Sequence, residues 1–363
     1  MRVIEVLGPS TGGIRRHVAT LAALMGDRGA EVTVAAPSGV MDGLDVGAAG
    51  RAEVAVPSSF SPTAIVAAVR AFRSLHRAVR PDLIHAHGLK AGWVAVLSRP
   101  RRPIVLTVHN VVLDEVAGRG ADLQRRLERA LLGRVDHIVA VSPEIVAHFD
   151  GRIAPDRIEF VIPASPSPVP RRTRAEIRSA LGVADDTVLV VVAARLHPQK
   201  DLPTFVEAWR TVHAAFPTAR AAIVGEGPLR DELAALVAAP DLGGTLLLAG
   251  PSPHAVDELA AADVVALSSR WEGAPLVIAE AMQLGRPVVS TRVGVVPEMV
   301  GDGGAIVEVG DAAALAGALC EFVGSPERRA EAGRVSLERG TVIYGAAPLV
   351  DQVARIYEEV LDR

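Results

Sequence analysis

Two carboxylates lie eight residues apart in the segment SSRWEGAPLVIAEAMQLGRPVVSTRVGVVPE, residues 268–298. Glu272 follows an apolar run that is typical of a buried strand, and Glu280 lies inside the helix that we expect to open at Pro275. Carboxylates accept hydrogen bonds from pairs of hydroxyl groups, so two at this separation can each hold a sugar ring. The exposed amides at the helix start suit a diphosphate. A solvated helix with two surface acids is the alternative, which the apolar surroundings disfavour.

Two cations precede this segment in AARLHPQKD, residues 193–201. Arg195 and Lys200 lie on the loop after a predicted strand, and two cations there can neutralise a leaving diphosphate, as metal ions do in other enzymes. A basic loop without function explains either residue alone, but it explains both together with the carboxylates poorly. Nearby, GEGPLRDEL at 225–233 is another strand-to-helix junction, and Gly225 is a candidate ligand contact.

A glycine pair, Gly12 and Gly13, lies between the first predicted strand and an amphipathic helix. Glycines there let the backbone approach a ligand closely, and the helix N-terminus favours an anion. The spacing is not G-x-G-x-x-G, and no acidic residue clearly ends the second strand, so a nicotinamide cofactor is disfavoured. A plain strand-to-helix turn is an equal alternative.

Histidines end two predicted strands: His85 and His87 in DLIHAHG, and His109 in IVLTVHN. Ligands bind at this edge of open α/β sheets. We interpret His109 as functional and His85 as a hydrogen-bonded core residue. No third clustered ligand of suitable spacing is evident, so zinc is disfavoured. The single cysteine, Cys320, excludes a disulfide framework, and its helical pattern indicates a core position.

Short β-branched runs alternate with alanine-rich stretches, which predicts two successive doubly wound α/β domains with a cleft between the carboxyl ends of their sheets. Several runs are nearly all apolar, as parallel strands buried on both faces are. The predicted strands are Arg2–Leu7, Glu31–Ala36, Leu83–Ala86, Ile104–Val108, His137–Val141, Thr187–Ala193, Ala221–Val224, Leu246–Ala249, Val264–Ala266, Pro287–Ser290 and Ala305–Val307.

A proline-rich segment, Val161–Arg172, separates the two series, with four prolines in the ten residues 162–171. Such a segment is extended and stiff, which is typical of a linker. We therefore place one domain at 1–165 and a second at 166–345. The remaining residues, 346–363, contain a helix at roughly Ala347–Leu361 that we expect to pack back on the first domain.

Composition favours a soluble protein with two cores, because half of the 363 residues are hydrophobic. We find no signal-peptide pattern and no apolar run of about 18–20 residues that could span a membrane, so we expect a cytoplasmic location. Residues 1–165 carry 20 Lys and Arg against 16 Asp and Glu, whereas residues 166–363 carry 18 against 26. The basic half suits an anionic surface or substrate.

Arginines gather in the first domain on an amphipathic helix at 66–81 and shortly after it: Arg70, Arg73, Arg77, Arg80, Arg99, Arg101 and Arg102. This is either a solvated helix face or a surface that touches an anionic membrane or an acceptor. No basic stripe is interleaved with aromatic residues, so nucleic acid is disfavoured as a partner.

The motifs together resemble those of glycosyltransferase family 4, which are retaining enzymes of the GT-B fold. The resemblance covers nearly the whole chain: GGIRRHV, RGAEVTVAAP, TVHN, VSP, AARLHPQKD, GEGP and EGAPLVIAEAMQLGRPVVST. The last motif is the family's Glu-(x)7-Glu signature. Two departures concern the donor: IPASPSP stands where the family often has Asn-Gly after Ile-Pro, and Gly294-Val295 replaces the usual Gly-Gly.

The resemblance implies transfer of a hexose-type sugar from a UDP- or GDP-linked donor to a hydroxyl of a glycan, such as an envelope polysaccharide, a lipid-linked acceptor or a small molecule. His109, Arg195, Lys200 and Glu272 would act at the reacting centre, and the two cations would replace a metal, so no cofactor is expected. The implied donor contacts are Gly12, Gly13, Gly225, Gly273, Ala274, Pro275, Leu276, Val277 and Glu280. A GT-B nucleotide-sugar epimerase and a non-catalytic sugar-nucleotide-binding protein are the alternatives.

Overall fold

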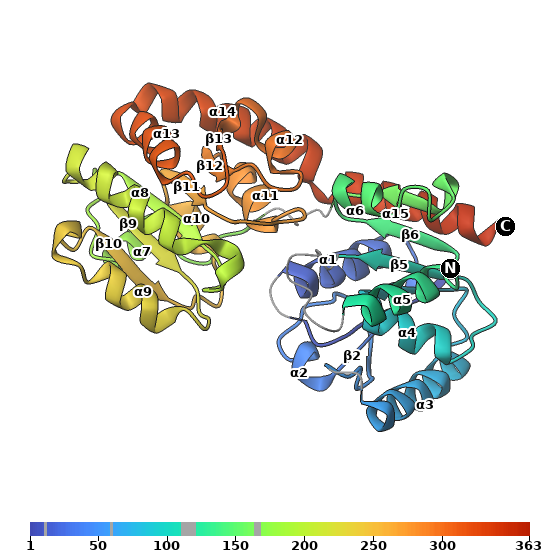
Figure 1. Ribbon diagram of the computed structural model, residues 1–363. Helices are drawn as coiled ribbons and strands as arrows, with labels where there is room; N and C mark the ends of the chain where they lie inside the picture. Colours follow the sequence, from blue (N-terminus) through green and yellow to red (C-terminus); the bar gives the residue numbers. More distant parts are fainter. Residues whose placement is uncertain (11–12, 59–60, 110–120, 163–167) are drawn as a thin grey trace. The chain divides into compact units, whose positions relative to one another are not determined.

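The computed structural model describes residues 1–10, 13–58, 61–109, 121–162 and 168–363, so residues 163–167 of the predicted linker lie outside it. The chain forms two compact units (Figure 1). Unit 1 contains Met1–Ala164 and Ala346–Arg363, and unit 2 contains Ser165–Gly345. Each is built on a parallel sheet, which confirms the predicted α/β class. Among the described residues, no helix is long and apolar enough to cross a membrane.

Unit 1 has a seven-stranded sheet in the order β3-β2-β1-β4-β5-β6-β7. Its strands are β1 (Arg2–Leu7), β2 (Glu31–Ala36), β3 (Gly50–Glu53), β4 (Leu83–His87), β5 (Ile104–Val108), β6 (His137–Ala140) and β7 (Ile158–Phe160). Its helices are α1 (Gly13–Asp27), α2 (Ser38–Met41), α3 (Pro62–Val79), α4 (Leu89–Leu97), α5 (Ala121–Leu132), α6 (Pro143–His148) and α15 (Ala346–Leu361).

The sheet of unit 1 is buried on both faces, because strand side chains alternate between them. In β1, Val3 and Leu7 join the core that α1 and α15 cover, whereas Ile4 and Val6 join the core on the opposite face. The last helix, α15, contributes buried residues at helical spacing, including Tyr357, to the first of these cores. The chain's last segment is therefore part of unit 1, beside α1.

Unit 2 has a six-stranded sheet in the order β10-β9-β8-β11-β12-β13. Its strands are β8 (Leu189–Ala193), β9 (Arg220–Val224), β10 (Leu246–Gly250), β11 (Val264–Leu267), β12 (Val288–Thr291) and β13 (Gly304–Val307). Its helices are α7 (Arg174–Ala180), α8 (Leu202–Ala215), α9 (Arg230–Val237), α10 (Val256–Ala261), α11 (Leu276–Gln283), α12 (Val296–Val300), α13 (Ala312–Gly324) and α14 (Pro326–Tyr344).

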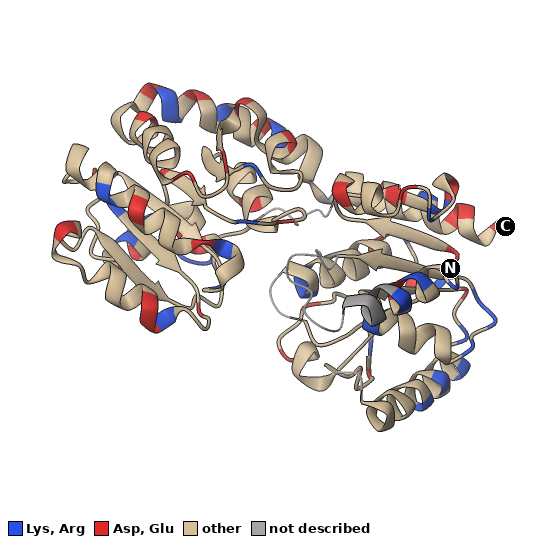
Figure 2. Ribbon diagram, in the orientation of Figure 1, with Lys and Arg blue, Asp and Glu red and all other residues tan. Residues whose placement is uncertain are grey.

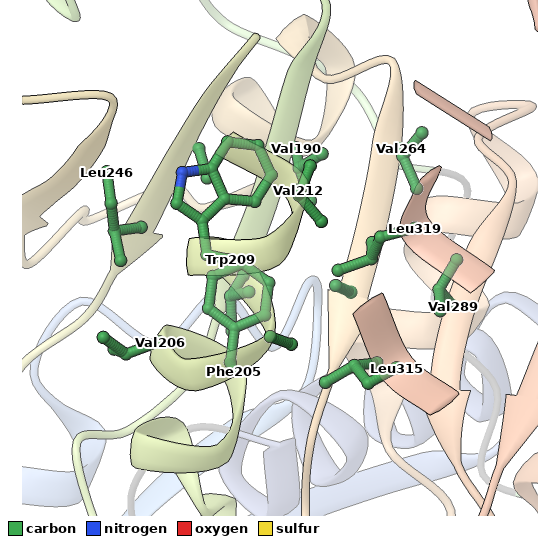
Figure 3. Close-up of a cluster of buried hydrophobic side chains, with 14 of the residues drawn as sticks. Val190, Phe205, Val206, Trp209, Val212, Leu246, Val264, Val289, Leu315 and Leu319 are labelled. Atoms are coloured by element: carbon green, nitrogen blue, oxygen red, sulfur yellow. The ribbon is translucent and has the colours of Figure 1, made fainter. Parts of the chain in front are cut away.

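One face of this sheet is covered by α8 and α13, whose apolar side chains meet over β8, β9 and β11 (Figure 3). Trp209 and Phe205 of α8 are fully buried there. Because a buried indole needs a hydrogen-bond partner, Trp209 Nε1 donates to Thr245 Oγ1 at 3.2 Å.

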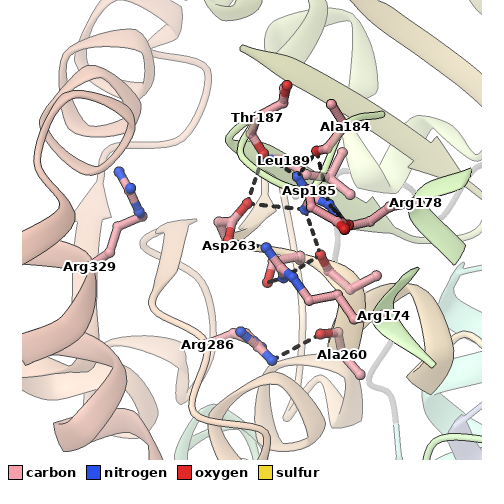
Figure 4. Close-up of polar contacts among 12 residues, drawn as sticks. Arg174, Arg178, Ala184, Asp185, Thr187, Leu189, Ala260, Asp263, Arg286 and Arg329 are labelled. Carbon is pink, nitrogen blue, oxygen red and sulfur yellow. Dashed lines mark hydrogen bonds and ion pairs between the residues drawn. The ribbon is translucent and has the colours of Figure 1, made fainter. Parts of the chain in front are cut away.

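A polar cluster ties α7 to the amino ends of β8 and β11 (Figure 4). Asp263 accepts hydrogen bonds from Arg174 at 2.6 Å, from Arg178 at 3.3 Å and from the Leu189 amide at 2.8 Å. The Arg178 side chain is fully buried and also donates to backbone carbonyls, including that of Ala184 at 2.7 Å. The charge of this arginine is thus paired and hydrogen-bonded, as burial requires.

The structure corrects several predicted boundaries. The strand expected at 187–193 begins at Leu189, because the Thr187 carbonyl is bound by Arg178 rather than by a neighbouring strand. Two edge strands, β3 and β7, are absent from the prediction. Where other predicted strand ends differ from the structure, they differ by one residue.

Candidate active site

In unit 2, the loops after β8 and β11 lie side by side, because these strands are neighbours in the sheet. Gln199 Nε2 donates to the Trp271 carbonyl at 2.8 Å, and the Arg270 amide donates to the Gln199 carbonyl at 2.8 Å. The turn Pro198–Lys200 is capped by His197, whose Nδ1 accepts from the Gln199 amide at 3.2 Å. These bonds bring Lys200 beside Glu272.

Lys200 and Glu272 form an ion pair between Nζ and Oε1. Ser269 Oγ donates to the same carboxylate oxygen at 2.5 Å. The side chains are 16% and 8% exposed, so the pair is largely removed from water, where electrostatic interactions are stronger. The pair places a cation that can bind phosphate next to an anion that can accept bonds from hydroxyls.

The helix α11 begins directly after this pair, with Pro275 at its N-cap and no side-chain cap. The amides of the first turn, at Leu276 and Val277, therefore have no capping side chain and form an anion-binding helix start. Glu280 lies on α11 and is 2% exposed, so it is not the surface acid of the alternative interpretation. Glu272 and the helix start are therefore adjacent, with Gly273 and Ala274 in the connecting loop, and Glu280 is a buried residue of the same helix.

Two glycines hold the loops of this site close together. A methyl group at Gly225 would lie 1.9 Å from the Ala194 carbonyl oxygen, so only glycine lets the GEGP loop approach the loop that carries Arg195. Arg195 itself is exposed. Gly294 has φ +51°, and a methyl group there would lie 2.3 Å from the carbonyl oxygens of Glu272 and Gly273. The Val295 side chain, which departs from the family's pattern, is buried in the core.

In unit 1, α1 begins at Gly13, whereas Gly12 lies outside the described residues. His17 of α1 is 4% exposed and lies near two of the strand-end histidines. Its ring centroid is 5.8 Å from that of His87 and 5.6 Å from that of His109. His17 is not among the residues predicted to be functional, although its position one turn after the glycine pair is a usable signal.

His85 is hydrogen-bonded through both ring nitrogens, to Tyr357 Oη at 2.7 Å and to Thr107 Oγ1 at 2.6 Å. The interpretation of His85 as a satisfied core histidine is therefore confirmed. His87 connects the functional candidate His109 to a further residue absent from the sequence analysis, Glu5.

The expectation that His85 and His87 have no third clustered ligand is wrong. Glu5, on the adjacent strand β1, brings a carboxylate oxygen to within 4.8 Å of their ring nitrogens. All three residues are buried, and their polar atoms are engaged with one another and with Tyr357. The Glu5 carboxylate and the ring nitrogens of His85 and His87 thus have hydrogen-bond partners within unit 1.

The basic helix is α3, and Figure 2 shows its positive charges along one side. Arg70, Arg77 and Arg80 are exposed. Arg73 is half-buried and donates to the carbonyls of Ser98 at 3.0 Å and Leu97 at 3.2 Å, so it fastens α3 to the next loop.

The structure therefore groups the predicted residues into separate sets. Unit 2 holds the ion pair, the start of α11, Glu280, Arg195 and Gly225 at one sheet edge. Unit 1 holds His109 within the histidine cluster, and the arginines of α3 form a surface of their own.

Two family models match this chain. The model for Glycosyltransferase Family 4 matches residues 11–163, and the model for Glycosyl transferases group 1 matches residues 187–325. The chain is 30% identical over 234 residues to TuaC of Bacillus subtilis, which is named as a teichuronic acid biosynthesis glycosyltransferase. That match covers 62% of this chain and only 57% of TuaC.

Other relatives match more of the chain. The D-inositol 3-phosphate glycosyltransferase of Corynebacterium efficiens is 29% identical over 77% of this chain and 71% of its own length. Among solved structures, Anabaena HepE in complex with UDP has a TM-score of 0.84 at 20% identity, covering 99% of this chain and 100% of that one. The same protein has also been solved with UDP-glucose.

Proposed function

Because the chain belongs to glycosyltransferase family 4 and has the GT-B fold, we propose that it transfers a hexose-type sugar from a nucleoside-diphosphate sugar to a hydroxyl group, with retention of configuration. The observation that carries this proposal is the largely buried Lys200–Glu272 pair next to the uncapped start of α11. A diphosphate satisfies the cation and the helix amides, and sugar hydroxyls satisfy the carboxylate.

Each charged residue of unit 2 has a defined role in this proposal. Lys200 and Arg195 neutralise the diphosphate as it leaves, and the amides at the start of α11 bind the same group. Glu272 accepts hydrogen bonds from donor-sugar hydroxyls, and Glu280 accepts them from the nucleotide ribose. These cations do the work of a metal ion, so the reaction needs none.

In the transfer step, the acceptor oxygen forms a bond to the anomeric carbon on the face from which the diphosphate departs. The bond between that carbon and the phosphate oxygen breaks, and the acceptor hydroxyl passes its proton to the leaving diphosphate. We propose that His109 also binds a hydroxyl of the donor sugar. Exclusion of water limits hydrolysis of the donor.

We favour uridine as the base, because Anabaena HepE, which shares the fold, was solved with UDP and UDP-glucose. The relatives are named for different products, teichuronic acid and D-inositol 3-phosphate glycosides among them, so a glycan, a lipid-linked and a small-molecule acceptor all remain candidates. The first experiment is a thermal-shift screen over UDP, GDP and their sugars. A ligand at a hundredfold excess over its Kd stabilises a protein by about 2.7 kcal/mol.

Variants test the assignment of the donor site. Lys200→Ala and Glu272→Ala should each reduce transfer by about 10²–10³-fold while the protein stays folded, because each removes a charge from the reacting centre. Arg210→Ala is the matched control, since it removes an ion-paired cation from the surface of α8 and should leave transfer unchanged. Near-normal transfer by both site variants would overturn the assignment.

Two assays separate this function from its alternatives. An epimerase converts a nucleotide sugar without any acceptor, so incubation with donor alone would yield an epimer. A sugar-nucleotide-binding protein would bind the donor but transfer nothing to any acceptor. Sugar transfer that requires the acceptor supports the proposal over both.

We further propose that unit 1 contacts anionic membranes peripherally. Unit 1 has a pocket of about 640 Å³ whose lining includes Arg99, Arg101 and Arg102 together with Asp82 and Asp136. In the described part of the chain, the side chains of these three arginines have no hydrogen-bond or ion-pair partner, so they are open to a phosphate headgroup. We expect the protein to co-sediment at low salt with phosphatidylcholine vesicles that contain phosphatidylglycerol. We expect no co-sedimentation with vesicles of phosphatidylcholine alone. Absence of binding at low salt would refute the contact.

A further inference from the structure

A chain of hydrogen bonds runs through the interior of unit 1 from β1 to the end of β5. His87 Nε2 lies 2.5 Å from Glu5 Oε2, and His87 Nδ1 lies 3.3 Å from His109 Nε2. Glu5 is fully buried, His87 is 3% exposed and His109 is 9% exposed. The chain thus begins at a carboxylate inside the sheet and ends at His109, the least buried of the three residues.

The Glu5 carboxylate is held in its ionised form. Burial alone would raise the pKa of Glu5, but the positive charge that His85 and His87 carry when protonated, together with their hydrogen bonds, lowers it below its ordinary value. Tyr357 Oη donates a hydrogen bond to Glu5 Oε1 at 2.8 Å. Because an ionised carboxylate only accepts hydrogen bonds, the proton between Glu5 and His87 must lie on His87 Nε2.

The neutral states of His87 and His109 fix the rest of the chain of hydrogen bonds. Burial lowers the pKa of His87 to about 4, so near neutral pH its Nδ1 carries no proton and accepts from His109 Nε2–H. Burial and the neighbouring His87, His17 and His85 lower the pKa of His109 well below its ordinary value. With its proton on Nε2, the neutral ring of His109 keeps a lone pair on Nδ1.

We propose that Glu5 is a positioning residue, which acts through His87 to fix the tautomer of His109 so that its Nδ1 accepts a hydrogen bond from a hydroxyl of the bound sugar. In the described part of the chain, His109 Nδ1 has no hydrogen-bond partner of its own. This role rests on the proposed transferase function, because that function supplies the sugar that His109 binds. The role specifies which ring nitrogen of His109 donates a hydrogen bond and which accepts one. A sugar hydroxyl can donate a hydrogen bond to this unprotonated nitrogen. In the opposite tautomer, Nδ1 carries the proton and can only donate.

If Glu5 had a purely structural role, it would not determine the tautomer of His109. This tautomer can be measured directly. Long-range ¹H–¹⁵N correlation spectra of the wild-type protein labelled on histidine distinguish protonated from unprotonated ring nitrogens. The signals that His109→Asn removes identify His109 among the ten histidines. We expect the proton on Nε2 at neutral pH. A proton on Nδ1, or on both nitrogens, would overturn the proposal without any activity measurement.

Glu5→Leu, which removes the acceptor while filling its space, tests the role in transfer. We expect kcat/KM to fall about tenfold, the loss of one hydrogen bond, with the Kd for UDP unchanged because unit 2 is untouched. Tyr357→Phe is the matched control: it deletes another bond to Glu5 but keeps the Glu5–His87 bond, and should keep transfer within about twofold.

A double-mutant cycle separates the relay from simple destabilisation. In His109→Asn, the amide oxygen stands near the place of Nδ1 and is not set by His87, so adding Glu5→Leu should change kcat/KM by less than about twofold. An equal tenfold loss in both backgrounds would overturn the relay. If Glu5→Leu does not fold, the wild-type tautomer still decides. If the wild type binds no nucleotide and transfers no sugar, the proposed function fails while the tautomer result stands.

Discussion

Gly294 offers a sharp test of how the loops of unit 2 hold the ion pair. It lies before α12 with φ +51°, a conformation that L side chains rarely adopt. Replacement by alanine would put a methyl carbon 2.3 Å from the carbonyl oxygens of Glu272 and Gly273. Both are backbone atoms, so no side-chain rotation relieves the overlap. The Gly273 carbonyl also accepts a hydrogen bond from the Val295 amide at 3.2 Å, which the movement would weaken.

The cost of Gly294→Ala has two parts. The left-handed conformation costs a residue with a Cβ about 1–2 kcal/mol. Overpacking that must move neighbouring backbone costs about 1–3 kcal/mol more. We therefore expect the free energy of unfolding of unit 2 to fall by about 2–5 kcal/mol. Gly310→Ala is the matched control, because Gly310 has φ +77° and a methyl group there meets nothing within 4 Å, so only the first part applies.

Denaturant titration followed by tryptophan fluorescence measures the free energy of unfolding of the two variants. Trp209 and Trp271 report on unit 2, and Trp93 reports on unit 1. The same proteins are assayed for transfer. A misplacement of about 1 Å at a reacting centre costs about a hundredfold in rate, so Gly294→Ala should lose that much while Gly310→Ala stays near the wild-type rate. Equal stability and equal transfer in the two variants would refute the view that Gly294 fixes the Glu272 loop.

Three further predictions concern charge and burial. Asp263→Ala leaves the buried Arg178 guanidinium with only the exposed Asp185 carboxylate, 3.9 Å away, and should lower the free energy of unfolding by about 3 kcal/mol in denaturant titration, whereas a change under about 0.5 kcal/mol would contradict that role. Burial lowers the pKa of His17 to about 3 and that of His87 to about 4. Below pH ~6.5 the unfolded chain therefore binds protons that the native chain does not, and unit 1 should lose up to about 1.4 kcal/mol per pH unit for each histidine between pH ~6.5 and ~4, measured as Tm against pH. A flat profile there would contradict the buried neutral cluster. Partial burial raises the pKa of the Cys320 thiol, so iodoacetamide should modify it more slowly than free cysteine near neutral pH, and an equal rate would contradict this partial burial.

The central strands are predictable from sequence because their apolar runs are bounded by turn residues. The bounds of β1, β2 and β5 agree with the prediction, and β1 and β2 are followed closely by proline. The edge strands β3 and β7 are not predictable in this way. Gly50–Glu53 is mostly exposed and has no apolar alternation, and it becomes a strand only because β2 offers a pairing edge.

The two carboxylates of the signature are predictable from their spacing, but their surroundings are not. The sequence predicts that Lys200 and Glu272 each face a ligand, and nothing in their separation of 72 residues indicates that they pair with each other. The pairing depends on β8 and β11 being neighbours in the sheet and on the Gln199 bonds between their loops. Sheet order is a property of the whole unit, so the local sequence does not contain it.

The histidine cluster shows what a local reading of one strand leaves out. Glu5 stands in the run RVIEVL, where a carboxylate among buried apolar residues is costly unless it finds donors. Its donors come from positions 80 or more residues away, because parallel pairing sets Glu5 opposite His85 and Leu7 opposite His87, and α15 adds Tyr357. A charged residue in a central strand is therefore a signal in itself: the fold must supply hydrogen-bond partners for it. Here those partners form a chain of hydrogen bonds from Glu5 to His109, which follows β5 at the sheet edge.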